Sequence, residues 1–136
     1  GDEMKKPRCN AHVPGFIYGF INKRTSLVKI GKVHDINNLI SRKIYAEYQI
    51  GVTDILFVLF DDTDYTSAET MIHRELKNGK MQHKEYREVF YADYKKIFDI
   101  ILLNHEYIVP VKNAIIKTKA DVEKYIEENS LQYYKI

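Results

Sequence analysis

The feature that most constrains the fold is an unbroken apolar run at residues 55–60, with an acidic residue on each side of it. Asp54 precedes the run and Asp61 follows it. An apolar segment this short does not suffice for a typical helix, and its lack of polar alternation is typical of a strand buried on both faces. Such a strand needs covering layers on each side, so the run predicts the central strand of an α/β domain.

A β-hairpin is predicted before this strand. Aromatic and β-branched residues over 16–22 and an apolar segment over 27–31 are separated by a four-residue loop, 23–26, which is a common hairpin length. The pairs expected to face each other are Asn22–Leu27, Phe20–Lys29 and Tyr18–Gly31. Because side chains alternate along a strand, this register places Tyr18 and Lys29 diagonally on one face.

Helical periodicity predicts three helices, over residues 36–48, 67–78 and 92–104. Asp35 is suited to cap the first helix, Thr66 opens the second, and Gly79 lies near its end. The side chains expected to be buried are Ile36, Leu39, Ile40, Ile44, Ala68, Ile72, Leu76, Ile97, Ile101 and Leu102. Arg42 is about 200° around the first helix from Ile40 and therefore faces away from its apolar stripe.

The order β-β-α-β-α-α predicts a small α/β sandwich, with a three-stranded, largely antiparallel sheet flanked by helices. Residues 86–90 can add a further short strand. We expect a polar, basic arm at 1–14, the folded domain at 15–106 and a C-terminal extension at 107–136. In that extension, residues 113–117 predict a short strand, and a polar helix over 119–129 follows Thr118.

Composition narrows the class of protein. Of the 136 residues, 45% are hydrophobic and 29% charged, as in globular domains, and no apolar run is long enough to span a membrane. With neither a secretory signal nor a second cysteine beside Cys9, we expect an intracellular, reducing compartment: the cytoplasm, including that of an infected host cell, or the nucleus. Residues 1–50 hold nine Lys or Arg against four Asp or Glu, which suits an anionic partner.

Two half-motifs and two downstream segments resemble one nuclease family. Gly15-Phe-Ile-Tyr18 and Lys29-Ile-Gly31 are similar to the paired motifs of the GIY-YIG nuclease superfamily. The segments Ala68-Glu69-Thr-Met-Ile-His73 and Arg87-Glu-Val-Phe90 resemble a subgroup of phages and large DNA viruses, which has "KIG" as its second motif and often Trp where this chain has Val89. The resemblance covers about residues 15–98, in order along the chain.

This resemblance implies a DNA endonuclease that hydrolyses a phosphodiester bond with Mg²⁺ or Mn²⁺. Tyr18 would orient or deprotonate the attacking water, with Lys29 supplying the positive charge that a tyrosine base needs at neutral pH. Arg42 would stabilise charge on the scissile phosphate, and Glu69 would hold the metal ion. The residues expected to contact the substrate are His34, Lys32, Lys23, Arg24 and His73.

Each of these side chains also has a structural interpretation. Tyr18 can pack in the core, and Lys29 and Arg42 can be solvated surface residues. The segment Thr66-Ser-Ala-Glu69 has the form of a capping box, in which the glutamate would bind the backbone of its own helix. His73 can be a hydrogen-bonded structural residue or a second metal ligand. Glu88 is an alternative metal carboxylate.

Two other functions remain open. The same fold could bind DNA or protein without turnover; Lys29, which stands where the wider family has a tyrosine, favours this function. Alternatively, the tyrosine-rich surface could bind a protein. A nuclease of this size would take its specificity from a homodimer or from a separate subunit; residues 131–136 could pair with a partner's sheet edge. No phosphate-binding glycine loop, zinc-protease motif or serine-nucleophile motif occurs in the sequence.

Overall fold

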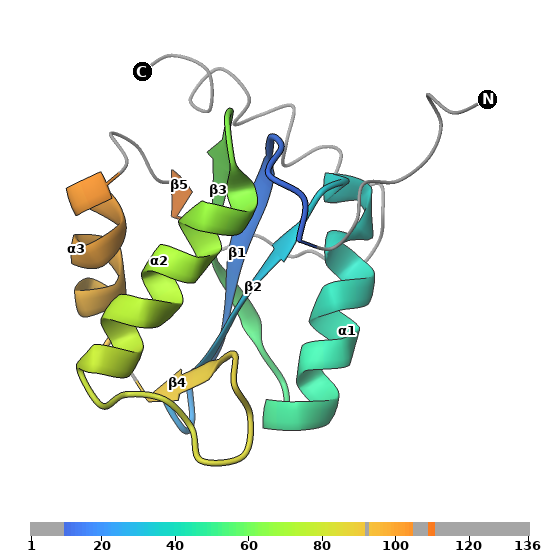
Figure 1. Cartoon of the computed structure of the whole chain (residues 1–136). Coiled ribbons are helices and arrows are strands. Elements are labelled where there is room, and N and C mark those ends of the chain that lie inside the picture. Colours follow the sequence, from blue (N-terminus) through green and yellow to red (C-terminus); the bar gives the residue numbers. More distant parts are fainter. Residues whose placement is uncertain (1–9, 92, 105–108, 111–136) are drawn as a thin grey trace.

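A computed structural model describes residues 10–91, 93–104 and 109–110. The helices and strands follow one another in a mostly alternating order (Figure 1). They are β1 (Gly15–Asn22), β2 (Leu27–Val33), the 3₁₀ turn η2 (Ile36–Asn38), α1 (Leu39–Ile50), β3 (Asp54–Asp61), α2 (Tyr65–Asn78), β4 (Val89–Tyr91), α3 (Tyr94–Asn104) and β5 (Val109–Pro110). The predicted segments at 113–117, 119–129 and 131–136, like most of the expected arm, lie outside the described residues.

The strands form one antiparallel sheet in the order β4-β2-β1-β3-β5. The prediction of a three-stranded sheet was wrong, since the short strands β4 and β5 add an edge on each side. The further strand expected over residues 86–90 forms as β4, whereas β5 was not predicted, because a run of two residues carries almost no periodic signal. The hairpin prediction is confirmed in full: β1 and β2 pair in the expected register, with Phe20 opposite Lys29 and Tyr18 opposite Gly31.

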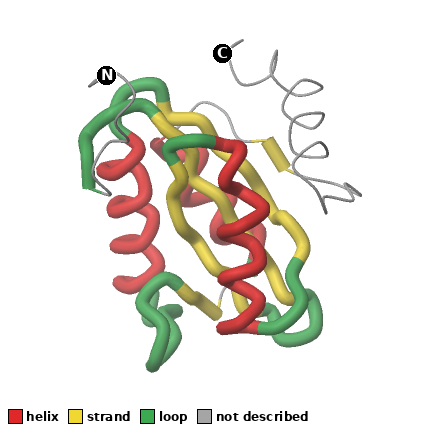
Figure 2. Tube along the Cα trace, turned by 90° about the vertical axis from the view of Figure 1, so that its right-hand side faces the viewer, coloured by secondary structure: helices red, strands yellow, loops and turns green. Residues whose placement is uncertain are grey.

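Helices cover both faces of this sheet, as a sandwich requires (Figures 1 and 2). On one face, α2 and α3 pack on a core that includes Ile17, Ile30 and Phe57. On the other face, α1 packs on a second core that includes Phe20 and Val58. The side chains of β3 therefore enter both cores, as predicted from its unbroken apolar run.

Two predictions of buried helix residues were wrong. Ile44 in α1 is 52% exposed, because the buried stripe of that helix is formed by Leu39, Ala46 and Ile50. Ile44 lies five residues after Leu39, about 140° around the helix from that stripe, and so faces solvent. Asp35 caps the 3₁₀ turn that precedes α1. Leu102 in α3 is 51% exposed.

The start of α2 also differs from the prediction. The helix begins at Tyr65 rather than after Thr66, and its cap is Asp64, whose carboxylate accepts a hydrogen bond from the Ser67 amide at 2.9 Å. Both Asp and Thr are good cap residues, so local preference does not decide between them. The chain before β1 helps to fix the choice, since the carbonyl of Val13 accepts a hydrogen bond from the Tyr65 amide at 2.9 Å.

Candidate functional site at the edge of strand β2

The edge of β2 is covered by another strand over only part of its length. β4 pairs with Leu27, Val28 and Lys29. At the next residue, the amide of Ile30 donates to the carbonyl of Glu88 at 2.9 Å, and the carbonyl of Ile30 accepts from His73 Nε2 at 2.8 Å. Helices α1 and α2 both contact β2, from opposite faces of the sheet. The segment around Ile30 and Gly31 is thus where residues of both helices can meet.

Tyr18 reaches toward this edge from the neighbouring strand. Its hydroxyl oxygen lies directly over Gly31, where a β-carbon would overlap it, and its ring stacks on Phe20 with centroids 4.4 Å apart. Burial of the side chain, and next the charge of Glu88, raise the pKa of Tyr18, whereas the charge of Arg42 lowers it. With a raised pKa, the hydroxyl is protonated at neutral pH and can donate a hydrogen bond.

Glu69 lies on the α2 side of the same edge. The residue is only 7% exposed, and its Oε2 atom has no hydrogen-bond partner among the described residues. Burial, and then the charge of Glu88, raise the pKa of Glu69 to about 7. The capping-box interpretation of this carboxylate was wrong, because the N-cap is Asp64 and the third helical residue, where a capping-box glutamate would stand, is Ser67. A buried carboxylate oxygen without a partner is costly, and such groups mark places where an ion or ligand can bind.

Lys29 is buried on the same face of the sheet as Tyr18, as expected, but its ammonium group pairs with Glu88 and Gln49 and not with the Tyr18 hydroxyl. Its Nζ lies 3.1 Å from Glu88 Oε2 and 3.0 Å from Gln49 Oε1, so it links the β4 side of the site to α1. Arg42, and not Lys29, is the cation whose charge lowers the pKa of Tyr18. The residue that sequence reasoning missed here is Gln49. Gly31 was expected to face Tyr18 as part of the second half-motif, and the structure adds that its lack of a side chain makes room for the Tyr18 hydroxyl.

Three cations act on the carboxylate of Glu69. The charges of Lys32, Lys29 and Arg42 all lower its pKa. Arg42 is exposed on α1, as predicted, and affects both Tyr18 and Glu69. Lys32 donates to Thr66 Oγ1 at 3.0 Å, and its ammonium lies 5.3 Å from the ring centre of Tyr65. Carboxylate, phenol and cations therefore meet at one edge of the sheet.

His73 has a structural contact in this site. Its Nε2 atom must carry the proton, because its partner, the Ile30 carbonyl, can only accept. The ring lies 5.3 Å from that of Phe90, and burial is the main cause that lowers the pKa of His73. The neutral histidine thus holds α2 against β2, one turn from Glu69.

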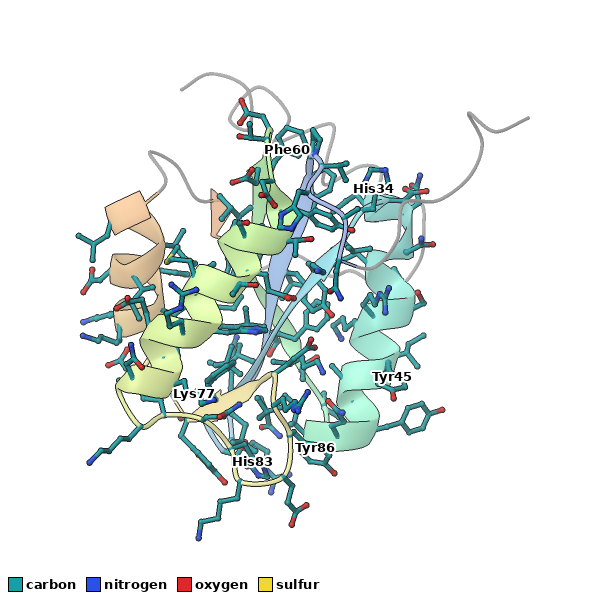
Figure 3. The ribbon with its side chains drawn as sticks, viewed as in Figure 1. His34, Tyr45, Phe60, Lys77, His83 and Tyr86 are labelled. Atoms are coloured by element: carbon teal, nitrogen blue, oxygen red, sulfur yellow. The ribbon has the colours of Figure 1, made fainter. Side chains whose placement is uncertain are left out.

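Of the other expected substrate residues, His34 lies at the Lys32 end of this cluster, and two lie away from it. His34 follows β2, near the top of Figure 3, where its ring nitrogen lies 3.1 Å from the carbonyl of Pro14 and its ring centre 6.0 Å from that of Tyr65. Lys23 and Arg24 belong to the hairpin loop at the other end of β2, and a seven-residue strand is about 20 Å long. Lys23 pairs there with Asp54 at 3.7 Å.

The donor set suits a hard divalent ion. Mg²⁺ is commonly held by one or two carboxylates, with water and substrate phosphate completing its shell. Glu69 presents a partnerless buried oxygen, and Glu88 is close enough for its charge to raise the pKa of Glu69. No group of three or more His, Cys, Asp or Glu side chains placed to enclose a metal ion occurs in the described part of the chain.

Comparison with known proteins gives one match. A family model for the T5orf172 domain matches residues 15–103, which is more than half of the chain. This is a phage-associated domain of the GIY-YIG/HNH-like endonuclease type. No curated protein and no solved structure matches the chain. Within residues 10–91, 93–104 and 109–110, no helix is long and apolar enough to cross a membrane.

Proposed function

The chain belongs to the T5orf172 domain family, and from this we propose that it is a metal-dependent DNA endonuclease with a GIY-YIG-type site at the edge of β2. The observation that carries the proposal is the carboxylate of Glu69, buried, without a hydrogen-bond partner for Oε2, and within the charge range of Arg42 and Lys29. A buried anion among cations, beside a phenol, suits phosphodiester hydrolysis better than it suits structural support.

Glu69 would hold Mg²⁺ or Mn²⁺, which when bound acts as a Lewis acid on a phosphate oxygen. Arg42 binds the same phosphate through its guanidinium, a planar donor whose geometry matches two phosphate oxygens. Its exposure on α1 leaves it accessible to a nucleic acid backbone. Lys29 neutralises Glu88 and so limits the repulsion that two carboxylates would exert on an incoming phosphate.

Tyr18 acts on the attacking water. Because burial raises its pKa, the hydroxyl stays protonated and positions the water by hydrogen bonding rather than removing its proton. Gly31 leaves the space in which the hydroxyl can lie at the sheet edge. The protein's own contribution is therefore orientation of the water and of the phosphate, with charge stabilisation by Arg42.

The test is incubation of the protein with supercoiled plasmid and with linear and branched DNA, in Mg²⁺, Mn²⁺ or EDTA. We expect nicked or linear products with either metal and none in EDTA. Intact DNA under all metal conditions, with the protein folded, would contradict the proposal.

A DNA-binding module without turnover is the second candidate. The observation that favours it is the pairing of Lys29 with Glu88 and Gln49, because this lysine stands where the wider GIY-YIG family has a tyrosine and is turned to other partners. Binding without cleavage, weakening steeply between about 50 and 200 mM salt, would identify this function. Binding that salt leaves unchanged would indicate a protein partner.

A further inference from the structure

The outer face of α1, the helix that carries Arg42 and Gln49, has large exposed side chains. Ile44 is 52% exposed, Tyr45 62% and Tyr48 84%. Figure 3 shows Tyr45 projecting away from the sheet. The carboxylate of Glu47 is turned elsewhere, since it accepts a hydrogen bond from the Thr53 amide at 2.7 Å and pairs with Lys43 at 3.3 Å. We call Tyr45 and Tyr48, with the adjoining Ile44, the aromatic face of α1.

Tyr45 is the member of this face that is spaced to be a helix neighbour of both Arg42 and Gln49. Residues three and four apart are neighbours on a helix surface, so Arg42, Tyr45 and Gln49 follow one line along α1. Gln49 binds Lys29 at 3.0 Å, and the charge of Arg42 acts on Tyr18 and Glu69. Tyr45 therefore lies within about one helical turn of both residues, and its ring is exposed to solvent.

We propose that the Tyr45 ring stacks on an unpaired nucleobase of the DNA strand whose phosphate Arg42 binds. The proposal rests on the proposed endonuclease function and names its substrate class: DNA with unpaired bases at the cleavage point, such as a single strand, flap or splayed junction. A base inside a continuous duplex is already stacked on both sides, so it offers no face to a tyrosine. An exposed aromatic ring beside a phosphate-binding cation is the arrangement by which proteins hold single strands.

Two features favour DNA over a second copy of the chain as the occupant. The aromatic face is continuous with Arg42, so a protein partner docked there would also cover the rim of the site. The one acidic residue of α1, Glu47, is also paired, with the Thr53 amide and Lys43, so α1 adds no unpaired carboxylate to this face. A surface with a cation and aromatic rings but no unpaired acidic group is complementary to a nucleic acid strand.

The experiment compares the whole chain with Tyr45→Ser and Tyr45→Phe. Tyr94→Ser is the matched control, since Tyr94 is a 46% exposed tyrosine on α3, on the other face of the sheet. Affinity is measured for single-stranded, splayed and blunt duplex oligonucleotides that contain 2-aminopurine, with Ca²⁺ in place of Mg²⁺ and at one salt concentration. Circular dichroism and thermal unfolding establish that each variant is folded.

We expect the unaltered chain to bind splayed and single-stranded DNA more tightly than duplex. Tyr45→Ser should weaken binding of unpaired DNA about tenfold, as loss of one base–aromatic stack does, and change duplex binding less than twofold. Tyr45→Phe and Tyr94→Ser should bind as the unaltered chain does. Quenching of 2-aminopurine by the unaltered chain and by Tyr45→Phe, but not by Tyr45→Ser, would identify stacking.

Three results would overturn the inference. Equal affinities of Tyr45→Ser and the unaltered chain for unpaired DNA, in a chain that cleaves DNA, would remove the stacking role and leave the endonuclease proposal standing. A dimer that Tyr45→Ser converts to monomer in sedimentation would assign the face to a second copy. Absence of both DNA binding and cleavage in the unaltered chain would overturn the stacking role together with the proposed function.

Discussion

The hydroxyl oxygen of Tyr18 occupies the space that a side chain at Gly31 would need. The two residues face each other across β1 and β2, and the missing β-carbon lets the phenol lie over β2 at the edge where the carboxylate of Glu69 is buried. This pairing explains in physical terms why the hairpin carries a tyrosine in its first strand and a glycine in its second.

Gly31→Ala is expected to displace the Tyr18 hydroxyl. Overpacking a buried position by one methyl group costs about 1–3 kcal/mol, and a shift of the phenol should lower the cleavage rate at least tenfold. The measurement is the cleavage rate together with urea unfolding. Gly79→Ala is the control, because Gly79 ends α2 with a negative φ of −77° and a β-carbon there would approach only the end of the Met81 side chain. Equal cleavage by both variants would contradict the role of Gly31.

Glu69→Gln is expected to stabilise the protein above pH 7. The folded-state pKa of Glu69 is raised to about 7 from 4.5, so the folded chain binds more protons than the unfolded chain and the unfolding free energy falls as pH rises through that window. The loss is at most about 3 kcal/mol, and a glutamine avoids it. Urea unfolding at pH 5 and pH 8 should show a stability gain of about 1–2 kcal/mol at pH 8 that shrinks toward pH 5. A variant less stable than the original at pH 8 would refute a buried, unpartnered charge.

A divalent ion should stabilise the original chain through the same carboxylate. For a dissociation constant near 1 mM, 10 mM Mg²⁺ adds about 1.4 kcal/mol to the unfolding free energy, which thermal unfolding at pH 8 can resolve. Glu69→Gln should show no such gain, while Glu75→Gln, at an exposed glutamate on the same helix, should keep it. Equal stabilisation of both variants would place the ion elsewhere.

Asp64→Ala should weaken the start of α2. The carboxylate of Asp64 accepts hydrogen bonds from the Ser67 amide at 2.9 Å and hydroxyl at 2.8 Å, and the amide bond is the main cause that lowers its pKa to about 2. This stabilisation is present above pH 4 and is lost as pH falls toward 2. The midpoint of thermal unfolding should therefore drop at pH 7 and change little at pH 2. Asp62→Ala, in the exposed loop before α2, should have a small effect at both pH values; an equal drop for Asp62→Ala would contradict the cap assignment.

Local patterns predicted the parts of the fold that local interactions determine. The four-residue loop set the hairpin register, and an apolar run without polar alternation identified β3. The burial of Ile44 was wrongly predicted because the buried stripe of α1 runs through Leu39, Ala46 and Ile50, about 140° around the helix from Ile44. The cap of α2 was wrongly predicted because its choice depends on contacts with residues before β1. The edge strand β4 was expected from its short run, but its bounds depend on pairing with β2; β5 depends on pairing with a distant segment, which two residues do not encode.

The candidate site was predictable to the extent that motifs identify residues. The motif resemblance selected Tyr18, Arg42 and Glu69, which come from β1, α1 and α2. The charges of Arg42 and Glu69 both act on the pKa of Tyr18. The partners of Lys29 could not be predicted, since Gln49 and Glu88 approach it only when α1 and the chain before β4 pack on the sheet. The catalytic roles of Tyr18, Lys29, Arg42 and Glu69 stay predictions.

The central claim is that the buried carboxylate of Glu69 supports DNA cleavage. The most direct test is single-turnover cleavage of one labelled oligonucleotide in Mg²⁺ by the original chain, by Glu69→Gln and by the control Glu75→Gln, with each variant shown to be folded. The account predicts that Glu69→Gln lowers the rate at least a hundredfold, corresponding to about 2.7 kcal/mol of transition-state stabilisation, and that Glu75→Gln leaves it unchanged. Cleavage by folded Glu69→Gln at the original rate would contradict it.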